Sequence, residues 1–257
     1  MKEWLARTEM LLGEEAMETL YAARVAVFGL GGVGGYAVEA LARSGIGTLD
    51  LIDPDRIEET NLNRQLLATR QTIGQYKVDV AAERIHAINP DAVVFPHRVF
   101  FLPDTADSFD FSAYDYVVDA IDTVTGKLAL IERAEAAGTP LISCMGAGNR
   151  MDAAAFEVAD IAETSVCPMA RVMRRELKKR GIEHLKVVYS REPALAPGGN
   201  GEVPKDTEDA VGSFESAAED APAEGRKKQP PGSNAFAPGA AGLLLAGEVV
   251  RDLIREA

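Results

Sequence analysis

The chain has 257 residues, of which 47% are apolar and 26% charged, and it contains two cysteines and three histidines. This length allows one large domain or a domain with an appendage, and it can bury enough surface to fold without a disulfide or a metal. The few cysteines exclude a disulfide scaffold and a four-thiolate zinc site. The formal charge of −13 excludes a surface coated all over in nucleic acid, although it is compatible with a local basic patch.

No export signal or membrane segment is expected from the sequence. The first 20 residues lack the apolar core and the small-residue cleavage site of a signal peptide. The longest apolar stretch, 239–247, is shorter than the roughly 20 residues of a spanning helix, and charged residues follow it. We therefore expect a soluble cytoplasmic protein with no membrane partner.

Short apolar segments alternate with amphipathic segments through the first part of the chain. The patterns predict strands at 24–30, 48–53, 92–96, 114–121 and 140–144, and helices at 33–44, 77–89 and 126–137. This alternation predicts an α/β fold with a mainly parallel sheet, right-handed crossovers and flanking helices.

The second part of the chain is less regular. It contains a predicted basic helix at 167–180, a strand at 186–190 and a closing helix at 238–256. Residues 193–230 are rich in proline, glycine and acid, and 202–224 alone hold eight acids against one lysine. Such a segment buries too little apolar surface to offset its ordering entropy, which predicts a flexible acidic insertion. We expect a domain at 1–150 and an extension of the same domain at 151–257.

A glycine-rich turn links the first predicted strand to the first helix. It carries Gly29, Gly31, Gly32 and Gly34, which allow a tight turn and a close approach of phosphate to the helix N-terminus. Asp53 ends the second strand, 19 residues after Gly34, where an acid can hydrogen-bond a ribose hydroxyl. The combination predicts a Rossmann-like nucleotide site.

A polar and cationic cluster further along distinguishes a triphosphate from a dinucleotide. The cluster consists of Asp55, Asn61, Arg64, Gln65 and Lys77. An arginine fork and a lysine can neutralise β- and γ-phosphate oxygens. Asp122 follows the fourth predicted strand, at the sheet edge where ligands bind, and a carboxylate there suits Mg²⁺. Taken singly, each residue is better explained as a surface arginine, a solvated lysine or a strand-capping aspartate, whereas the combination in this order favours a triphosphate site.

The order of the motifs GLGGVG, DPD, NLNRQ, GQYKV and DAID resembles the adenylating domain of E1-like activating enzymes. In that superfamily a carboxylate attacks the α-phosphate of ATP, giving an acyl-adenylate and pyrophosphate. The resemblance implies that the glycines and Asp53 bind the nucleotide, with Asp55 beside them. It also implies phosphate contacts from Asn61, Arg64, Gln65 and Lys77, and Mg²⁺ on Asp122.

Arg7 stands in an N-terminal R-x-x-x-L-L-G setting. It resembles the arginine that reaches ATP from the partner subunit in this superfamily, which implies a homodimer with shared sites. The alternative is an ordinary exposed helix arginine.

The branch of the superfamily is indicated by later segments. Sulfur-carrier adenylyltransferases usually carry two C-x-x-C pairs for zinc, whereas this chain has only Cys144 and Cys167. A ubiquitin-activating enzyme needs further domains for which the chain has no room. SCMGAGNRMD, CPMARVMRRELKKRGI, KVVYSRE and PGSNAFAPGAAGLLLAGEVV instead resemble the tRNA threonylcarbamoyladenosine dehydratases. This resemblance covers nearly the whole chain except 193–230.

The resemblance implies ATP-dependent dehydration of N6-threonylcarbamoyladenosine at position 37 of tRNA. The threonine carboxylate would be adenylated, and a neighbouring urea atom would then displace AMP and close a ring. Arg64, Lys77, Asp122 and Arg7 are the expected catalytic residues, with ATP and Mg²⁺ and without zinc. The sequence leaves open a monovalent cation and a sulfur-donor or other protein partner.

The basic segment supplies an independent prediction. Residues 171–186 hold seven Arg or Lys against two Glu, a charge of +5 that leaves −18 for the rest of the chain. Such asymmetry favours local contact with a phosphate backbone. The predicted tRNA-binding residues are Arg171, Arg174, Arg175, Lys178, Lys179 and Arg180. The alternative is a solvated amphipathic helix whose Val172, Met173 and Leu177 face the core.

Cys167 precedes Pro168 at a predicted helix N-terminus, a position that favours a thiolate. Because the proposed cyclisation is intramolecular, it needs no covalent relay, and we predict that neither cysteine is an essential nucleophile. Three other functions stay open. They are a sulfur-carrier or ubiquitin-like protein adenylyltransferase without zinc, an NAD-dependent oxidoreductase, and a non-catalytic nucleotide-dependent module.

Overall fold

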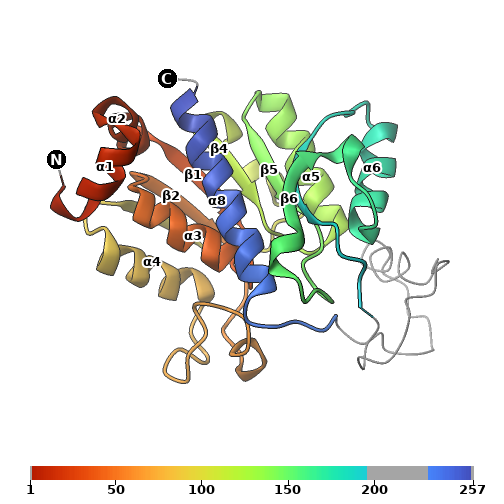
Figure 1. Ribbon diagram of the computed structural model, residues 1–257, viewed down its shortest axis with the longest axis horizontal. Helices are drawn as coiled ribbons and strands as arrows, with labels where there is room; N and C mark the ends of the chain where they lie inside the picture. Colours follow the sequence, from red (N-terminus) through yellow and green to blue (C-terminus); the bar gives the residue numbers. More distant parts are fainter. Residues whose placement is uncertain (1, 196–230, 256–257) are drawn as a thin grey trace.

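The computed structural model describes residues 2–195 and 231–255, so most of the predicted insertion at 193–230 lies outside the described residues. The described part forms one seven-stranded sheet in the order β3-β2-β1-β4-β5-β7-β6, with helices on both faces (Figure 1). The strands are β1 (Arg24–Phe28), β2 (Thr48–Ile52), β3 (Val93–His97), β4 (Tyr116–Asp119), β5 (Leu141–Cys144), β6 (Phe156–Asp160) and β7 (Lys186–Ser190). The helices are α1 (Ala6–Leu12), α2 (Glu14–Ala22), α3 (Gly34–Ser44), α4 (Lys77–Ile88), α5 (Val124–Ala137), α6 (Pro168–Lys179) and α8 (Ala237–Arg255).

The sheet is parallel from β3 to β7, and only the edge strand β6 runs antiparallel to its neighbour. The predicted α/β fold class and the predicted strands are therefore confirmed. Sequence analysis did not predict β6, α1 or α2.

The central strand β1 is buried on both faces of the sheet. Val25 and Val27 belong to the apolar cluster shared with α3 and α8, whereas Ala26 and Phe28 belong to the cluster shared with α5. A parallel strand covered on both sides needs apolar residues at every position, which explains its unbroken apolar sequence.

The glycine turn after β1 requires glycine at two positions. Gly29 has a φ of +90°, and a Cβ there would lie 2.6 Å from the Ala120 carbonyl oxygen. A Cβ on Gly34 would lie 1.7 Å from the Gly29 carbonyl oxygen. Glycine at position 34 therefore permits a tight turn between the end of β1 and the start of α3.

The later part of the chain completes the same layers. It adds β7 and β6 to the sheet, and α8 packs along α3 (Figure 1). A Cβ on Gly242 would lie 2.3 Å from the Val33 carbonyl oxygen, so this glycine allows the two helices their close approach. The division at residue 150 remains a prediction. Among the described helices, none has the length and apolar character needed to cross a bilayer.

Candidate nucleotide-binding site

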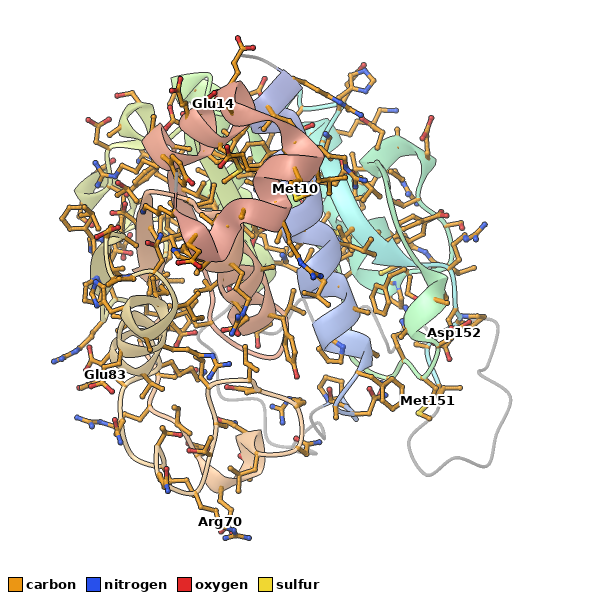
Figure 2. All side chains as sticks on the ribbon, turned by 60° about the vertical axis from the view of Figure 1, so that its left-hand side comes forward. Met10, Glu14, Arg70, Glu83, Met151 and Asp152 are labelled. Carbon is orange, nitrogen blue, oxygen red and sulfur yellow. The ribbon has the colours of Figure 1, made fainter. Side chains whose placement is uncertain are left out.

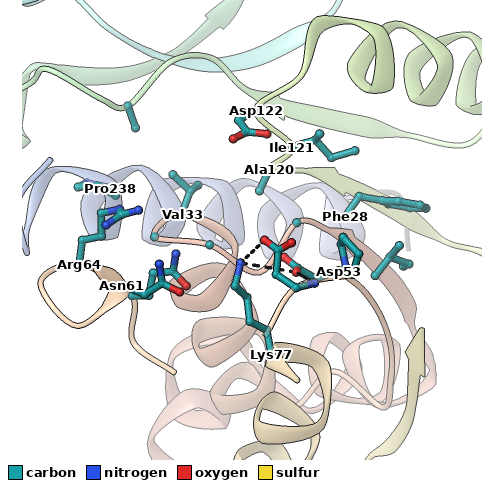
Figure 3. Close-up of a pocket in the computed structure, with 18 of the residues that line it drawn as sticks. Phe28, Val33, Asp53, Asn61, Arg64, Lys77, Ala120, Ile121, Asp122 and Pro238 are labelled. Atoms are coloured by element: carbon teal, nitrogen blue, oxygen red, sulfur yellow. Dashed lines mark hydrogen bonds and ion pairs between the residues drawn. The ribbon is translucent and has the colours of Figure 1, made fainter. Parts of the chain in front are cut away.

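A cavity of about 510 Å³ opens at the carboxyl ends of β1, β2 and β4 (Figure 3). The chain leaves β1 toward β2 on one side, whereas β4 lies on the other, so the cavity sits at the topological switch point where α/β proteins bind ligands. Its lining includes the predicted residues Gly29, Gly31, Gly32, Asp53, Asp55, Asn61, Arg64, Gln65, Lys77 and Asp122. Segments up to about 90 residues apart in the chain thus meet where sequence analysis expected a nucleotide.

The glycine turn presents open backbone to this cavity. A Cβ on Gly31 would have only the Gln65 side-chain nitrogen nearby, at 4.0 Å, so an incoming group can approach the backbone. Gly32 is more enclosed, because a Cβ there would lie 3.1 Å from Pro238. Gly34 does not line the cavity, and its part in the site is to shape the turn.

Asp53 ties the end of β2 to the glycine turn. The Leu30 amide donates to its Oδ2 at 2.6 Å, and the Asp55 amide donates to its Oδ1 at 2.9 Å. Burial raises the pKa of the Asp53 carboxyl, an effect opposed by the Lys77 ammonium and by these amide hydrogen bonds. A carboxylate can accept further hydrogen bonds, so a ribose hydroxyl remains a suitable additional partner.

Lys77 is the first residue of α4 and is only 5% exposed. Its Nζ lies 2.6 Å from Asp55 Oδ2 and 3.6 Å from Asp53 Oδ1 (Figure 3). Asp55 is well exposed, so the closer of the two ion pairs can be exchanged for a phosphate oxygen without uncovering a buried charge.

Two buried amides stand beside the lysine. Asn61 Oδ1 accepts a hydrogen bond from the Glu58 amide at 3.1 Å, which fixes the start of the short 59–61 turn. Gln65 Oε1 is buried and has no hydrogen-bond partner within the described chain. A buried polar atom without a partner on a cavity wall fits a site whose ligand completes the hydrogen bonding.

Arg64 supplies the second cation of this wall. Its Nη1 donates to the Thr60 carbonyl at 2.8 Å and to Asn63 Oδ1 at 2.9 Å. Among residues 2–195 and 231–255, no carboxylate pairs with its guanidinium, which leaves its positive charge for an anionic ligand.

Asp122 lies on the opposite wall, beyond the end of β4 (Figure 3). Its carboxylate is exposed and makes no hydrogen bond or ion pair within the part of the chain that the structure describes. The same part contains no group of three or more His, Cys, Asp or Glu that could hold a metal.

The inner part of the cavity is apolar, which sequence analysis did not predict. Phe28, Ile52, Val99, Phe101 and Ile121 line it. The Phe28 and Phe101 rings meet edge to face with centroids 4.9 Å apart. This wall offers an apolar surface of the kind against which an aromatic ring can pack, and the charged side chains line another side of the cavity. Sequence analysis also missed Arg56 and Glu58, which line the polar side.

Arg7 is not part of this cavity. It is exposed on α1, and α2 leads directly into the amino end of β1, so both helices lie at the edge of the sheet opposite the site. Figure 2 shows the same separation between Met10 of α1 and Arg70, whose loop continues from the cavity wall. Within one chain, the structure therefore does not bring Arg7 to the other predicted site residues.

The six predicted tRNA-binding cations on and just after α6 are not equivalent. Arg174 is half-buried, and its guanidinium donates to the carbonyl oxygens of Ile161 and Thr164 and to the Thr164 hydroxyl. Arg175, Lys179 and Arg180 are exposed around Glu176. Arg171 and Lys178 are exposed and have no ion pair within the described residues.

The opposite face of α6 is packed as the amphipathic pattern predicts, because Val172, Met173 and Leu177 are buried. Cys167 occupies the N-cap position of this helix without a side-chain capping hydrogen bond, and it is 3% exposed. Burial raises the pKa of the Cys144 thiol to about 12, which makes it unreactive at neutral pH.

Comparison with known proteins identifies the class to which this fold and site belong. The family model described as the ThiF family matches residues 5–256. The chain is 41% identical to a tRNA threonylcarbamoyladenosine dehydratase of Bacillus subtilis over 257 residues, covering 100% of this chain and 96% of the relative. It is 39% identical to the dehydratase of the same name from Escherichia coli over 204 residues, covering 76% of each chain.

A solved structure of the Escherichia coli dehydratase in complex with ATP matches with a TM-score of 0.83 and 31% identity. The match covers 99% of this chain and 95% of that one. The chain therefore belongs to the ThiF family, with the E1-like fold that its motifs indicate.

Proposed function

We propose that this protein catalyses the ATP-dependent dehydration of N6-threonylcarbamoyladenosine at position 37 of tRNA. The observation that best supports this proposal is the cavity. In it, Lys77 and Arg64 face Asp122 at the topological switch point of the sheet, beside an apolar wall. The chain that builds this cavity is similar over its full length to a dehydratase of that substrate.

ATP fits the residues present. The apolar wall suits the base, Asp53 the ribose, and the open glycine turn with Arg64 and Lys77 the phosphates. The unpartnered amide oxygen of Gln65 supports a ligand on the same wall, because side-chain rotation lets an amide offer either a donor or an acceptor.

Mg²⁺ would be held by Asp122, since hard oxygen ligands suit this ion and it commonly binds through one carboxylate, phosphates and water. When bound, it neutralises charge on the phosphate oxygens.

The proposed reaction begins with the threonine carboxylate of the modified base. Because a carboxylate is ionised at neutral pH, its attack on the α-phosphorus needs no general base, and pyrophosphate leaves. A urea atom then attacks the activated acyl carbon, a urea proton is lost, and AMP departs with one carboxylate oxygen. The net change is the loss of one water from the nucleoside.

The residues of this chain contribute position and charge. Arg64 and Lys77 stabilise the negative charge that develops on the phosphates. Both are held by neighbouring residues before substrate arrives, Arg64 by Thr60 and Lys77 by Asp55. Holding the carboxylate and the phosphate in one orientation supplies the remaining acceleration.

The surface beside the cavity supports tRNA as the carrier of the substrate. Ala147 and Gly148 line the cavity, and a Cβ on the preceding Gly146 would lie 3.8 Å from Met169 Cβ in the first turn of α6. The basic helix therefore starts next to the cavity. Arg171 and Lys178 are seven residues apart, which places both cations on one face of this helix.

A homodimer is the proposed assembly, and the cytoplasm the proposed compartment. Arg7 lies at the far edge of its own sheet, so it can contribute only to the cavity of a second copy. Its helix also leaves Met10 and Leu11 87% and 82% exposed, an apolar surface suited to a protein interface.

Mass analysis of nucleosides tests this function. Modified tRNA is incubated with the protein, Mg²⁺ and ATP, and we expect loss of one water from threonylcarbamoyladenosine only when ATP is present. Unchanged tRNA, with ATP–pyrophosphate exchange only after addition of a small carrier protein, would favour the adenylyltransferase alternative. Stabilisation by NAD instead of ATP in a melting experiment would favour an oxidoreductase.

A further inference from the structure

A buried ion pair lies behind the cavity wall that contains Asp122, on the side away from the cavity. Lys127 of α5 and Asp119 at the end of β4 are both 0% exposed, and Lys127 Nζ lies 3.0 Å from Asp119 Oδ2. The same ammonium lies 3.3 Å from Ser143 Oγ and donates to the Cys144 carbonyl at 2.7 Å. All three N–H donors of the ammonium thus have partners, on the ends of two adjacent strands.

The carboxylate of Asp119 connects this pair to the cavity. Its Oδ2 also accepts a hydrogen bond from Ser143 Oγ at 2.6 Å, and its Oδ1 accepts one from the Ile121 amide at 3.1 Å. Ile121 and the following Asp122 both line the cavity. The ion pair therefore fixes the first peptide of the turn that carries Asp122.

The same turn is fixed from its other side by the glycine turn. Ala120 approaches Gly29 so closely that a Cβ on Gly29 would lie 2.6 Å from the Ala120 carbonyl oxygen. The segment 120–122 is thus enclosed between the nucleotide-binding turn and the ion pair. A displacement of the ion pair would move the Asp122 carboxylate relative to Lys77 on the facing wall.

Stability alone does not explain a charged pair in this place. Removing two charges from water is costly, and apolar residues of similar volume often replace a buried ion pair with no loss of stability. What an apolar pair cannot supply is the set of directional hydrogen bonds to Ser143, Cys144 and Ile121. Lys127 also differs from Lys77, because its ammonium is closed off from the cavity and has no donor left for a ligand.

We infer that Lys127 is a positioning residue, which acts through Asp119 to hold the 120–122 turn and thereby sets where the Asp122 carboxylate meets Mg²⁺ and the phosphates. This inference rests on the proposed function, because it concerns the same site. Lys127 itself touches neither nucleotide nor substrate.

The first variant to test is Lys127→Met combined with Asp119→Asn, which removes both charges and leaves no unpaired buried ion. We expect ATP affinity without Mg²⁺ to stay within about twofold of wild type, since the glycine turn and Asp53 are untouched. We expect kcat to fall about 100-fold, the loss typical of a small displacement of a reacting group, and half-maximal activity to need more Mg²⁺. If the pair served only to stabilise the fold, the double variant would have a lower melting temperature, but kcat would not fall while ATP affinity stayed unchanged.

The matched control is Arg24→Met combined with Asp50→Asn. It removes an ion pair of 2.8 Å whose carboxylate is also buried, at the amino end of β1 and away from the cavity. We expect the control to change the melting temperature but to leave kcat as in wild type. Equal loss of kcat in both double variants would overturn the inference, because the effect would then be general destabilisation.

If the double variant does not fold, the milder variant Ser143→Ala still tests the inference. It removes the short hydrogen bond to Asp119 and the longer one from Lys127, but no charge. We expect kcat to fall at least about fivefold, the rate equivalent of one ordinary hydrogen bond, with ATP affinity unchanged. Wild-type kcat in Ser143→Ala would overturn the inference.

Failure of the proposed function is separately visible. If wild-type protein does not dehydrate modified tRNA, that function is wrong, yet Mg²⁺-dependent tightening of ATP binding can still be compared by calorimetry. Equal tightening in the wild type and the charge-free double variant would then overturn the positioning role, whereas tightening lost only in the double variant supports it.

Discussion

The cavity and the basic helix α6 both gather positive charge, but they do so in different ways. In the cavity, Lys77 is 5% exposed and is held between two carboxylates, on a wall built from separate segments of the chain. On α6, the cations come from one continuous segment. Five of the six are exposed, and three of these surround Glu176.

The difference in exposure separates two tasks. A buried charge acts strongly on a nearby phosphate, because little water screens it. Exposed charges are screened by salt and contribute little individually, but together they hold a polyanion. Single substitutions in the cavity should therefore lower turnover by about 100-fold or more, whereas substitutions on α6 should change tRNA affinity by modest and roughly additive amounts.

The largest effect is expected for Lys77→Met. Loss of the ammonium removes the buried cation from the phosphate wall, and we expect kcat to fall by at least about 10³-fold. Circular dichroism should show a folded protein, because Asp55 is exposed and the buried carboxylate of Asp53 keeps its two amide hydrogen bonds. Arg133→Met, which removes an exposed cation of α5 outside the cavity, is the control and should retain kcat. Turnover within tenfold of wild type in Lys77→Met would remove Lys77 from the chemistry.

Asp122→Asn should have the next largest effect. The substitution keeps the shape of the side chain and removes the charge proposed to hold Mg²⁺, so we expect kcat to fall by about 10²-fold and the dependence on Mg²⁺ to weaken. Because Asp122 is exposed and makes no hydrogen bond or ion pair within the described residues, the melting temperature should not change. Normal Mg²⁺ dependence in this variant would refute the metal assignment.

A smaller effect is expected when Arg171 and Lys178 are both changed to Glu. These two cations have no ion pair within the described chain, and we expect tRNA binding to weaken about tenfold with a shallower salt dependence. Filter binding at several salt concentrations measures both quantities. Arg174→Glu is not equivalent, because it breaks hydrogen bonds to the 161–164 turn and should lower the melting temperature as well. Unchanged binding of the double variant would place the tRNA elsewhere.

The smallest effect, and one of opposite sign, is expected for Glu176→Gln. Hydrogen bonds from Lys179, Arg175 and Arg180 lower the pKa of Glu176 from 4.5 to about 2. The substitution removes one negative charge from beside these three cations, although Arg180 keeps its ion pair with Glu132, so tRNA should bind about two- to threefold more tightly at low salt. Weaker binding would mean that Glu176 orders the cations and does not merely neutralise them.

The same residue gives a pH prediction. Because the folded-state pKa of Glu176 lies below its unfolded value, the carboxylate stabilises the fold fully above pH 4.5 and loses this contribution as the pH falls toward 2. Acid unfolding of Glu176→Gln should therefore be less steep in this window than that of wild type.

Much of the fold was predictable because its signals are local. The apolar strands, the glycine turn and the position of Asp53 each follow from spacing within a few residues, and the parallel sheet follows from their alternation. The edge strand β6 was missed because Phe156 alone is buried, while the other four residues are half-buried and show no clear alternation.

The rest of the site depends on contacts between distant segments. A lysine near the start of a helix carries no local sign of burial, and the role of Lys127 becomes visible only when the ends of β4 and β5 are adjacent in the fold. The apolar wall has the same origin, since Phe28 and Phe101 come from strands and loops far apart in the chain. For Arg174, a sequence pattern of basic residues could not distinguish a capping role from a solvated one.

The central claim is that the threonine carboxylate is activated by transfer of an adenylyl group. Modified tRNA carrying ¹⁸O in that carboxylate tests it directly, with mass analysis of the products after a single turnover with ATP. The account predicts one ¹⁸O atom in the phosphate of AMP, with pyrophosphate unlabelled. Label in inorganic phosphate, formed together with ADP, would contradict it and would show that the γ-phosphate is the activating group.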